Sequence, residues 1–440
     1  MPVIAAIIFL ILAVTPFPAA AAGVAEHSLP NGLEVFVVED HKSPLAVFQI
    51  WYRVGARNEV SGRTGISHVL EHMMFKGTAK YGSKELSRTV GRFGGSDNAG
   101  TSRDFTFYHQ ILPSDKLEVS FRFESDRMKN LLLRDEDILA ETRVVMEERR
   151  MRYEDDPESS LFENVVAMAF KVHPYHWPVI GWMPDLESIG PRDLRDYYEK
   201  YYCPNNAFIV VAGDVEPGEV FRLAGEYFGG LEPCPPAESF VTAEPPQDGE
   251  RRVLLRKEAQ LPYVEAAYRV PSIPHEDSFA LDVLAGILSG GKSSRLYRSL
   301  VYEKKIALSA YAQYSGTQVD PYLFFLGGTA APGREARELE EALYEEVEAI
   351  KKEPPTEFEL EKAKNQVEAS FVMGQDSIQF QAQVVGQFEI LGDWRLKDRY
   401  LEGIRAVTAR DIQRVADKYL TKENRTVGVL VPLGGGDGGS

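Results

Sequence analysis

The chain has 440 residues, of which 44% are hydrophobic and 26% are charged, and its net charge is −17. This composition excludes a disordered protein, and the length allows two or more domains, each with its own core. The acidic balance argues against a nucleic-acid backbone or an anionic membrane as a partner. A solvated acidic surface explains this charge, and a weak preference for neutral or basic ligands is the alternative.

The N-terminal segment differs from the rest of the chain. Residues 1–23 carry no charged side chain, and the apolar run PVIAAIIFLILAV is followed by TPFPAAAAG. This pattern is typical of a secretory signal over residues 1–22 that is cleaved after Ala22, which predicts an exported, periplasmic protein. The segment lacks the usual N-terminal lysine or arginine and approaches the roughly 20 residues of a membrane span, so an uncleaved membrane anchor is the alternative.

The chain contains only two cysteines, Cys203 and Cys234. A disulfide would persist in an exported protein. A single pair makes no disulfide framework, however, and two unpaired thiols are the favoured interpretation. The fold is therefore expected to depend on its hydrophobic cores.

The sequence contains an internal repeat. A shift of 218 residues aligns RDLRDYYEKYYCPNNAFIVVAGDV (192–215) with RDIQRVADKYLTKENRTVGVLVPL (410–433), matching Asp193 with Asp411 and Tyr201 with Tyr419. The same shift aligns the strand-like GLEVFVVED (32–40) with ERRVLLRKE (250–258). A period of this length indicates a duplicated domain rather than a solenoid.

Each half mixes apolar strands with helical stretches such as 114–133, without regular alternation of strand and helix. This pattern predicts α+β halves, each a sheet covered by helices. Pro and Gly cluster between the halves, where a linker is expected. The predicted organisation is a first domain (23–230), a linker (231–250), a second domain (251–432) and a flexible glycine-rich tail (433–440).

The stretch ISHVLEHMMFKG (66–77) places two of the chain's eight histidines four residues apart. In a helix, His68, Glu71 and His72 share one face. Imidazole is a good zinc ligand, and a nearby carboxylate can take a proton from water. The segment 135–152 is a helical stretch that places Glu141 and Glu148 two turns apart on one face, a spacing that is also typical of a solvated helix.

These motifs together resemble the inverzincin family of pitrilysin or insulinase-like zinc metallopeptidases, and in particular the mitochondrial processing peptidase and its compact bacterial relatives. The resemblance spans nearly all of the mature chain. Its motifs are LPNGLEVFVVED, HVLEHMMFKGT, GGSDNAGTSRDFTFYHQIL, ETRVVMEE, HPYHWPVIG, YYCPNNAFIVVAGDV and GGKSSRLYRSLVYEK. Duplicated α+β halves are also the architecture of that family.

The resemblance implies a zinc endopeptidase that cleaves peptides or unfolded segments within a chamber. It implies that His68, His72 and Glu148 bind one Zn²⁺ per chain and that Glu71 is the general base. Glu141 would support the site by orienting a ligand. The second half has Gly286 and Gln366 where the first has His68 and Glu148, so it is expected to be non-catalytic.

The resemblance also bears on assembly and on substrate binding. Arg295 and Tyr302 match the pair that the family places opposite the zinc, where they would stabilise an oxyanion. One chain therefore carries both parts of the site, as in relatives that form homodimers, although a heterodimer with a paralogue is the alternative. Asn98 and Ala99 match the family's substrate-binding strand within NAGTSRDFTFYHQ (98–110), which would pair with extended peptides. An ordinary structural strand is the alternative.

Two alternatives remain open at this level. His173 and His176 resemble a second metal pair, but the prolines around them disfavour a helix, so a structural role is expected. The isolated histidines are expected to be surface or packing residues. For the chain as a whole, the alternative to an enzyme is a non-catalytic scaffold or subunit of the same fold, which the complete zinc motif argues against.

Overall fold

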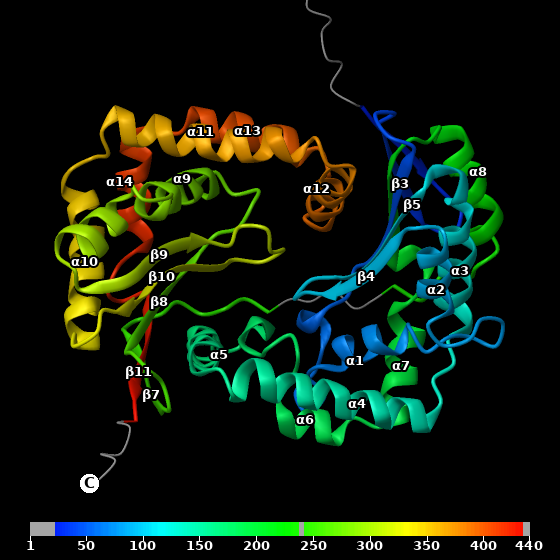
Figure 1. The fold of residues 1–440 in the computed structure, drawn as a ribbon, viewed down its shortest axis with the longest axis horizontal. Coiled ribbons are helices and arrows are strands. Elements are labelled where there is room, and N and C mark those ends of the chain that lie inside the picture. Colours follow the sequence, from blue (N-terminus) through cyan, green and yellow to red (C-terminus); the bar gives the residue numbers. More distant parts are fainter. Residues whose placement is uncertain (1–22, 237–241, 434–440) are drawn as a thin grey trace, which may run out of the picture.

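The computed structural model describes residues 23–236 and 242–433. The predicted signal, most of the predicted tail and part of the predicted linker lie outside the described residues. Figure 1 shows two α+β halves side by side, each with one sheet, which confirms the predicted fold class. In the described part of the chain, no helix has the length and apolarity needed to cross a membrane.

The first half contains a six-stranded sheet in the order β1-β2-β6-β3-β5-β4. The central strands are buried because both faces are covered, whereas β4 lies at an edge. The predicted strand at 98–110 is broken, since β4 ends at Thr101 and β5 begins at Thr106. The strands are β1 (Val24–Ser28), β2 (Glu34–Glu39), β3 (Leu45–Tyr52), β4 (Ser96–Thr101), β5 (Thr106–Pro113) and β6 (Ala207–Gly213).

Helices of the first half pack on one face of this sheet around a core that includes Phe48, Ile50 and Phe121. The alternation of side chains along a strand places Phe48 and Ile50 on the same face. The helices are α1 (Ile66–Met73), α2 (Glu85–Arg92), α3 (Glu118–Asn130), α4 (Asp135–Arg149), α6 (Met183–Ser188), α7 (Pro191–Tyr201) and α8 (Pro217–Phe228), with the short helices η1 (Ala56–Asn58), η2 (Ser114–Lys116), η3 (Arg150–Glu154), η4 (Pro174–His176) and η5 (Pro204–Asn206).

The second half repeats this arrangement in a sheet of order β7-β11-β8-β10-β9. The 218-residue shift carries β3 onto β8 and α7 onto α14, so the predicted duplication is confirmed. The strands are β7 (Arg251–Lys257), β8 (Tyr263–Val270), β9 (Ala307–Tyr314), β10 (Tyr322–Ala330) and β11 (Arg425–Pro432). The helices are α9 (Asp277–Ser289), η6 (Tyr297–Glu303), α10 (Ala336–Lys352), α11 (Glu357–Gly374), α13 (Leu396–Ala406) and α14 (Ala409–Tyr419).

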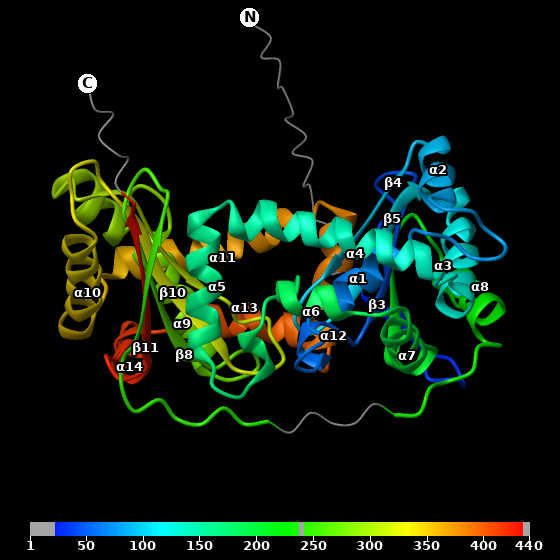
Figure 2. The same ribbon diagram turned by 90° about the horizontal axis from the view of Figure 1, so that it is seen from below.

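The two halves exchange one helix each. Helix α5 (Pro157–Ala169) belongs to the first half in sequence but packs on β7, β8 and β11, and its counterpart α12 (Ile378–Ile390) packs on β2, β3 and β6 (Figures 1 and 2). Val165 of α5 joins Tyr263 and Phe325 in one core, while Val385 of α12 joins Trp51 in another. Burial of apolar surface in both cores stabilises the two halves against each other.

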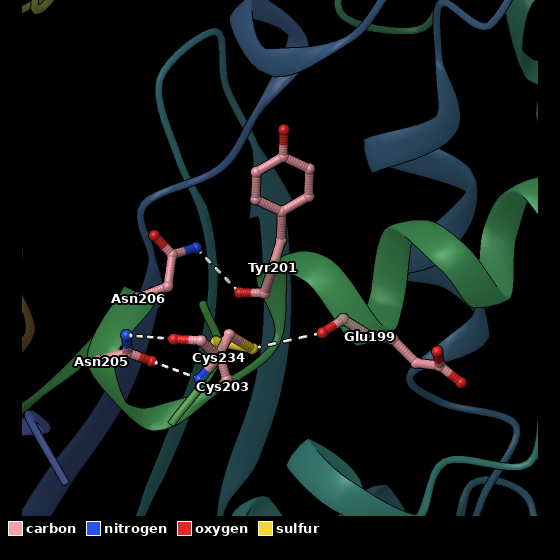
Figure 3. Close-up of a disulfide and its surroundings, with 6 residues drawn as sticks. All are labelled: Glu199, Tyr201, Cys203, Asn205, Asn206 and Cys234. Carbon is pink, nitrogen blue, oxygen red and sulfur yellow. Dashed lines mark hydrogen bonds between the residues drawn. A yellow bond between two sulfur atoms is a disulfide. The ribbon is translucent and has the colours of Figure 1, made fainter. Parts of the chain in front are cut away.

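Cys203 and Cys234 form a disulfide (Figure 3), so the expectation of two unpaired thiols was wrong. The side chain of Asn205 holds the same turn, since its Nδ2 donates to the carbonyl oxygen of Cys234 at 2.9 Å and its Oδ1 accepts from the amide of Cys234 at 2.9 Å. This close approach depends on how the segment after α8 returns to η5. The sequence contains no local signal for it.

Candidate active site

Helix α1 presents two different faces. Ile66, Val69 and Leu70 are buried against the sheet, whereas His68 and His72 lie on the other face with their rings 4.9 Å apart. The helix begins after Gly65, which adopts φ 88°, a conformation that glycine reaches without strain. This geometry fixes the direction in which the histidine face points.

The buried carboxylate of Glu59 caps the first turn of α1. Its oxygens accept hydrogen bonds from the backbone amides of Gly65 at 2.7 Å and Ser67 at 2.9 Å. These amides have no partner within the helix, so the cap satisfies them. Burial raises the pKa of Glu59 to about 8 despite these hydrogen bonds.

Helix α4 brings a third candidate ligand to the histidines. The Oε2 atom of Glu148 lies 3.5 Å from Nε2 of His72 and 3.9 Å from Nε2 of His68. One ligand atom from each of the three residues lies within 4.8 Å of the others. Two nitrogens and one carboxylate oxygen form a ligand set typical of catalytic zinc sites.

Each of two candidate ligands has a partner that orients it. Glu141, one of the predicted residues, has its Oε2 at 3.2 Å from Nδ1 of His72, and its other oxygen pairs with Nζ of Lys76. Glu148 presents Oε2 to the histidines because Nη2 of Arg152 lies 2.9 Å from its Oε1. Such contacts fix the tautomer and direction of metal ligands.

The environment of His68 also fits a metal ligand. Burial lowers the pKa of His68 to about 3, so its imidazole is neutral and keeps a lone pair. The ligand set, its convergence and this neutral ring together fit a zinc ion.

Glu71 lies beside the three candidate ligands and lines the same cavity, whose volume is about 540 Å³. Its Oε2 accepts a hydrogen bond from Oγ1 of Thr101 at 2.5 Å, and burial raises its pKa. Asn98 and Ala99 line the cavity from the edge strand β4. The structure therefore brings the predicted base and the predicted peptide-binding strand to one place.

Sequence reasoning missed several residues of this cavity. Thr101, Arg152, Tyr153, Val179 and Ile180 also line it. Arg152 follows Glu148 by one helical turn, a spacing that could have indicated the ion pair. Val179 and Ile180 come from a loop far along the chain, and only the tertiary fold places them here.

Arg295 and Tyr302 do not join this cavity within one chain, because its lining residues all lie between 68 and 180. Nε and Nη2 of Arg295 donate to the two carboxylate oxygens of Glu359 at 2.8 and 3.0 Å. Tyr302 lies on η6 with 71% of its surface exposed. Both residues lie in the second half.

The other histidines are arranged differently. Nε2 of His173 lies 3.2 Å from Oδ2 of Asp320, and Nδ1 of His176 lies 2.7 Å from the carbonyl oxygen of His173. The groups of described residues with metal-ligand spacing do not include this pair. In the described part of the chain, a second group with ligand spacing is Glu39, His41 and Glu216, and all three are exposed.

Two similar halves with mixed sheets, together with a His-x-x-Glu-His helix and a glutamate from α4, are the features of the inverted-motif metallopeptidase class. The chain belongs to peptidase family M16. A family profile described as "Insulinase (Peptidase family M16)" matches residues 34–181, and one described as "Peptidase M16 inactive domain" matches residues 188–367.

Similar proteins match along nearly the whole chain. The zinc protease PqqE of Helicobacter pylori is 33% identical over 415 residues, covering 92% of each chain. The uncharacterized zinc protease YmxG of Bacillus subtilis is 26% identical and covers 93% of this chain and 98% of its own. The crystal structure of a protease from Helicobacter pylori superimposes with a TM-score of 0.89 at 33% identity, covering 93% of this chain and all of that one.

Proposed function

We propose that this protein is a zinc endopeptidase that hydrolyses peptides or unfolded polypeptide segments. The observation that carries the proposal is the convergence of His68, His72 and Glu148, with the Glu71 carboxylate lining the same cavity. Relatives in the family are named zinc proteases, which supports the same chemistry. One Zn²⁺ per chain would be held by these three side chains.

The proposed mechanism assigns a role to each residue around the cavity. When bound, zinc would supply Lewis-acid chemistry by lowering the pKa of a water and polarising a carbonyl. Glu71 takes the proton of the attacking water and delivers it to the leaving amine. Burial raises the pKa of this carboxyl, which brings it nearer to neutral pH and suits a group that both accepts and donates a proton. Glu141 holds His72 in position throughout.

The substrate is proposed to bind as an additional strand along the free edge of β4. Asn98 and Ala99 belong to this edge and line the cavity. An added strand is recognised mainly through backbone hydrogen bonds, which predicts a loose sequence preference. The scissile carbonyl of a peptide paired with β4 would then lie beside Glu71.

The chain is proposed to act as a homodimer, with a heterodimer of paralogues as the alternative. Arg295 and Tyr302 do not line the cavity of their own chain, and the exposed phenol of Tyr302 is free to contact a second molecule. Two chains that enclose a chamber would let each supply this pair to the other's site. A guanidinium and a phenol can hold a carbonyl and stabilise its oxyanion.

The protein is further proposed to be exported to the periplasm, on the strength of the signal-like residues 1–22.

The first experiment measures zinc per chain in the purified mature protein, together with hydrolysis of a quenched fluorescent peptide before and after chelation. We expect about one zinc per chain and activity that chelation removes and zinc restores. Absence of zinc and of turnover under zinc-replete conditions would instead indicate the scaffold alternative.

Glu71→Gln separates catalysis from metal binding. Because the amide cannot accept a proton, this variant should retain zinc and lose hydrolysis. Peptide hydrolysis at the wild-type rate by the zinc-loaded variant would refute the proposed mechanism.

A further inference from the structure

The second half contains a cavity of about 680 Å³ at the position that the candidate active site occupies in the first half. The two cavities are related by the same 218-residue shift as the sheets. The second cavity is lined by Gly286, Gly290, Gln366, Ser370 and Phe371, which are the counterparts of His68, His72, Glu148, Arg152 and Tyr153.

Among the described residues, no group with metal-ligand spacing lines this second cavity. Both histidine positions are glycine, and a Cβ on Gly290 would lie 2.7 Å from Oε1 of Gln366. The same Cβ would lie 2.4 Å from the carbonyl oxygen of Gly286, so a side chain here would require both the backbone and Gln366 to shift. The amide of Gln366 replaces the carboxylate of Glu148. The cavity is thus retained without the zinc ligands, which suggests a role in binding rather than in metal chemistry.

A carboxylate without a countercharge lies in this cavity. Asp282, one turn before Gly286 on α9, accepts a hydrogen bond from the hydroxyl of Tyr400. Burial raises its pKa, and the described residues contain no lysine, arginine or histidine that forms an ion pair with it. The neighbouring cation of Lys362 is engaged elsewhere, since it donates to Gly290 and Ser293.

Aromatic rings form the wall around this carboxylate. Phe371 lies 6.0 Å from Phe380 at an angle of 80° and 6.3 Å from Tyr400, measured between ring centroids. Phe380 fits against α11 because Gly374 has no side chain, and a Cβ there would lie 2.5 Å from the ring. Ring faces attract cations, and apolar walls accept an aliphatic stem.

Helix α9, which lines the cavity with Asp282 and Gly286, also contacts strand β9. Ser289, the counterpart of Glu71, donates its hydroxyl to the carbonyl oxygen of Ala312 in β9 at 2.8 Å. Strand β9 ends its sheet as β4 ends the first. An extended peptide added to β9 would lie in the same half as the cavity, and Asp282 lies on the helix that contacts β9, seven residues before Ser289.

We propose that the cavity beside Asp282 binds the side chain of a lysine or arginine in an extended peptide, with the cation held between the carboxylate and the rings of Phe371, Phe380 and Tyr400. The inference rests on the proposed function only in taking this peptide to be a substrate. The second half would then hold the peptide while the first half cleaves it.

The test is a binding measurement in the Glu71→Gln background, which does not require turnover. Two capped peptides of extended sequence, identical except for one lysine or its uncharged isostere norleucine, are titrated by fluorescence anisotropy. We expect the lysine peptide to bind about tenfold more tightly. The added variant Asp282→Asn, which keeps the shape of the side chain and the acceptor for Tyr400, should reduce this ratio to about twofold or less.

Glu368→Gln is the matched control, because it also removes one negative charge from the second half. Glu368 lies on α11, pairs with Arg405 and does not line the cavity. It should leave the lysine preference intact. Phe380→Leu should lower the preference without changing charge, so the proposal stays testable if Asp282→Asn unfolds. Equal binding of the two peptides, or a preference that survives both Asp282→Asn and Phe380→Leu, would overturn it. Loss of hydrolysis or zinc would bear on the proposed function alone, because this assay needs neither.

Discussion

Glu141→Gln tests whether the contacts behind His72 set the zinc affinity of the proposed site. In the wild-type chain one carboxylate oxygen of Glu141 faces Nδ1 of His72 at 3.2 Å, and the other pairs with the ammonium group of Lys76. Both contacts require an acceptor on Glu141 when Nδ1 carries the proton. An amide provides only one acceptor, so one contact must be lost.

The magnitude follows from which contact is lost. In the Glu141→Gln variant the amide oxygen is expected to face Lys76, because an amide NH₂ group cannot accept from an ammonium group. The NH₂ group then faces Nδ1 of His72 and favours the tautomer with the proton on Nε2. Nε2 is the atom nearest Glu148, at 3.5 Å, and a protonated Nε2 cannot bind metal. Changes to such orienting partners cost about 10 to 100-fold in metal affinity.

The assay is competition for zinc against a chromophoric chelator at neutral pH. Glu147→Gln is the control, because Glu147 lies on the same helix, pairs with Arg150 at the surface and does not line the cavity. We expect wild-type affinity for this control. If Glu141→Gln binds zinc as tightly as the control, the tautomer argument is wrong.

Three further outcomes are expected. Thr101→Val should lower kcat about tenfold at unchanged zinc content, because a hydrogen bond to the Glu71 carboxylate is lost. Thr101→Ser keeps the hydroxyl and should retain the wild-type kcat. An equal loss of kcat in the serine variant would indicate that Thr101 acts through packing. Burial raises the pKa of Glu59 from 4.5 to about 8, so between these pH values the folded state holds a proton that the unfolded state has released. The stability of the wild-type protein should therefore fall as the pH rises through this range. If melting temperatures of Glu59→Gln fall with pH as steeply as those of the wild type, this reasoning is wrong. Gly386→Ala should cost about 1–3 kcal/mol in urea unfolding, because its Cβ would lie 2.3 Å from the Trp51 ring, and an unchanged midpoint would show that α12 can shift.

Local patterns in the sequence were enough to predict much of the fold and part of the candidate active site. His68 and His72 share a face because a helix turns every 3.6 residues, and no packing is needed to infer this. Glu148 is different, since its spacing also suits a solvated helix, and only the approach of α4 to α1 brings its Oε2 within 3.9 Å of both histidines. The family resemblance anticipated that placement, whereas the residues alone left it open.

Other features had no sequence signal. The bond between Cys203 and Cys234 depends on a return of the chain that no local pattern predicts. The same holds for the exchange of α5 and α12, because an apolar helix face does not specify which of two similar sheets it covers. The cavity beside Asp282 likewise combines residues from α9, α11, α12 and α13.

The sequence by itself determined the duplicated α+β halves, the helix carrying His68, Glu71 and His72, and the absence of such a motif in the second half. These features follow from periodicity and composition, which act over a few residues or repeat along the chain. The tertiary structure decided that Thr101 contacts Glu71, that Arg152 orients Glu148, and that Arg295 lies outside the cavity of its own chain. Such contacts join residues that are close only after the core has packed, because burial of apolar surface, rather than local preference, selects which elements meet.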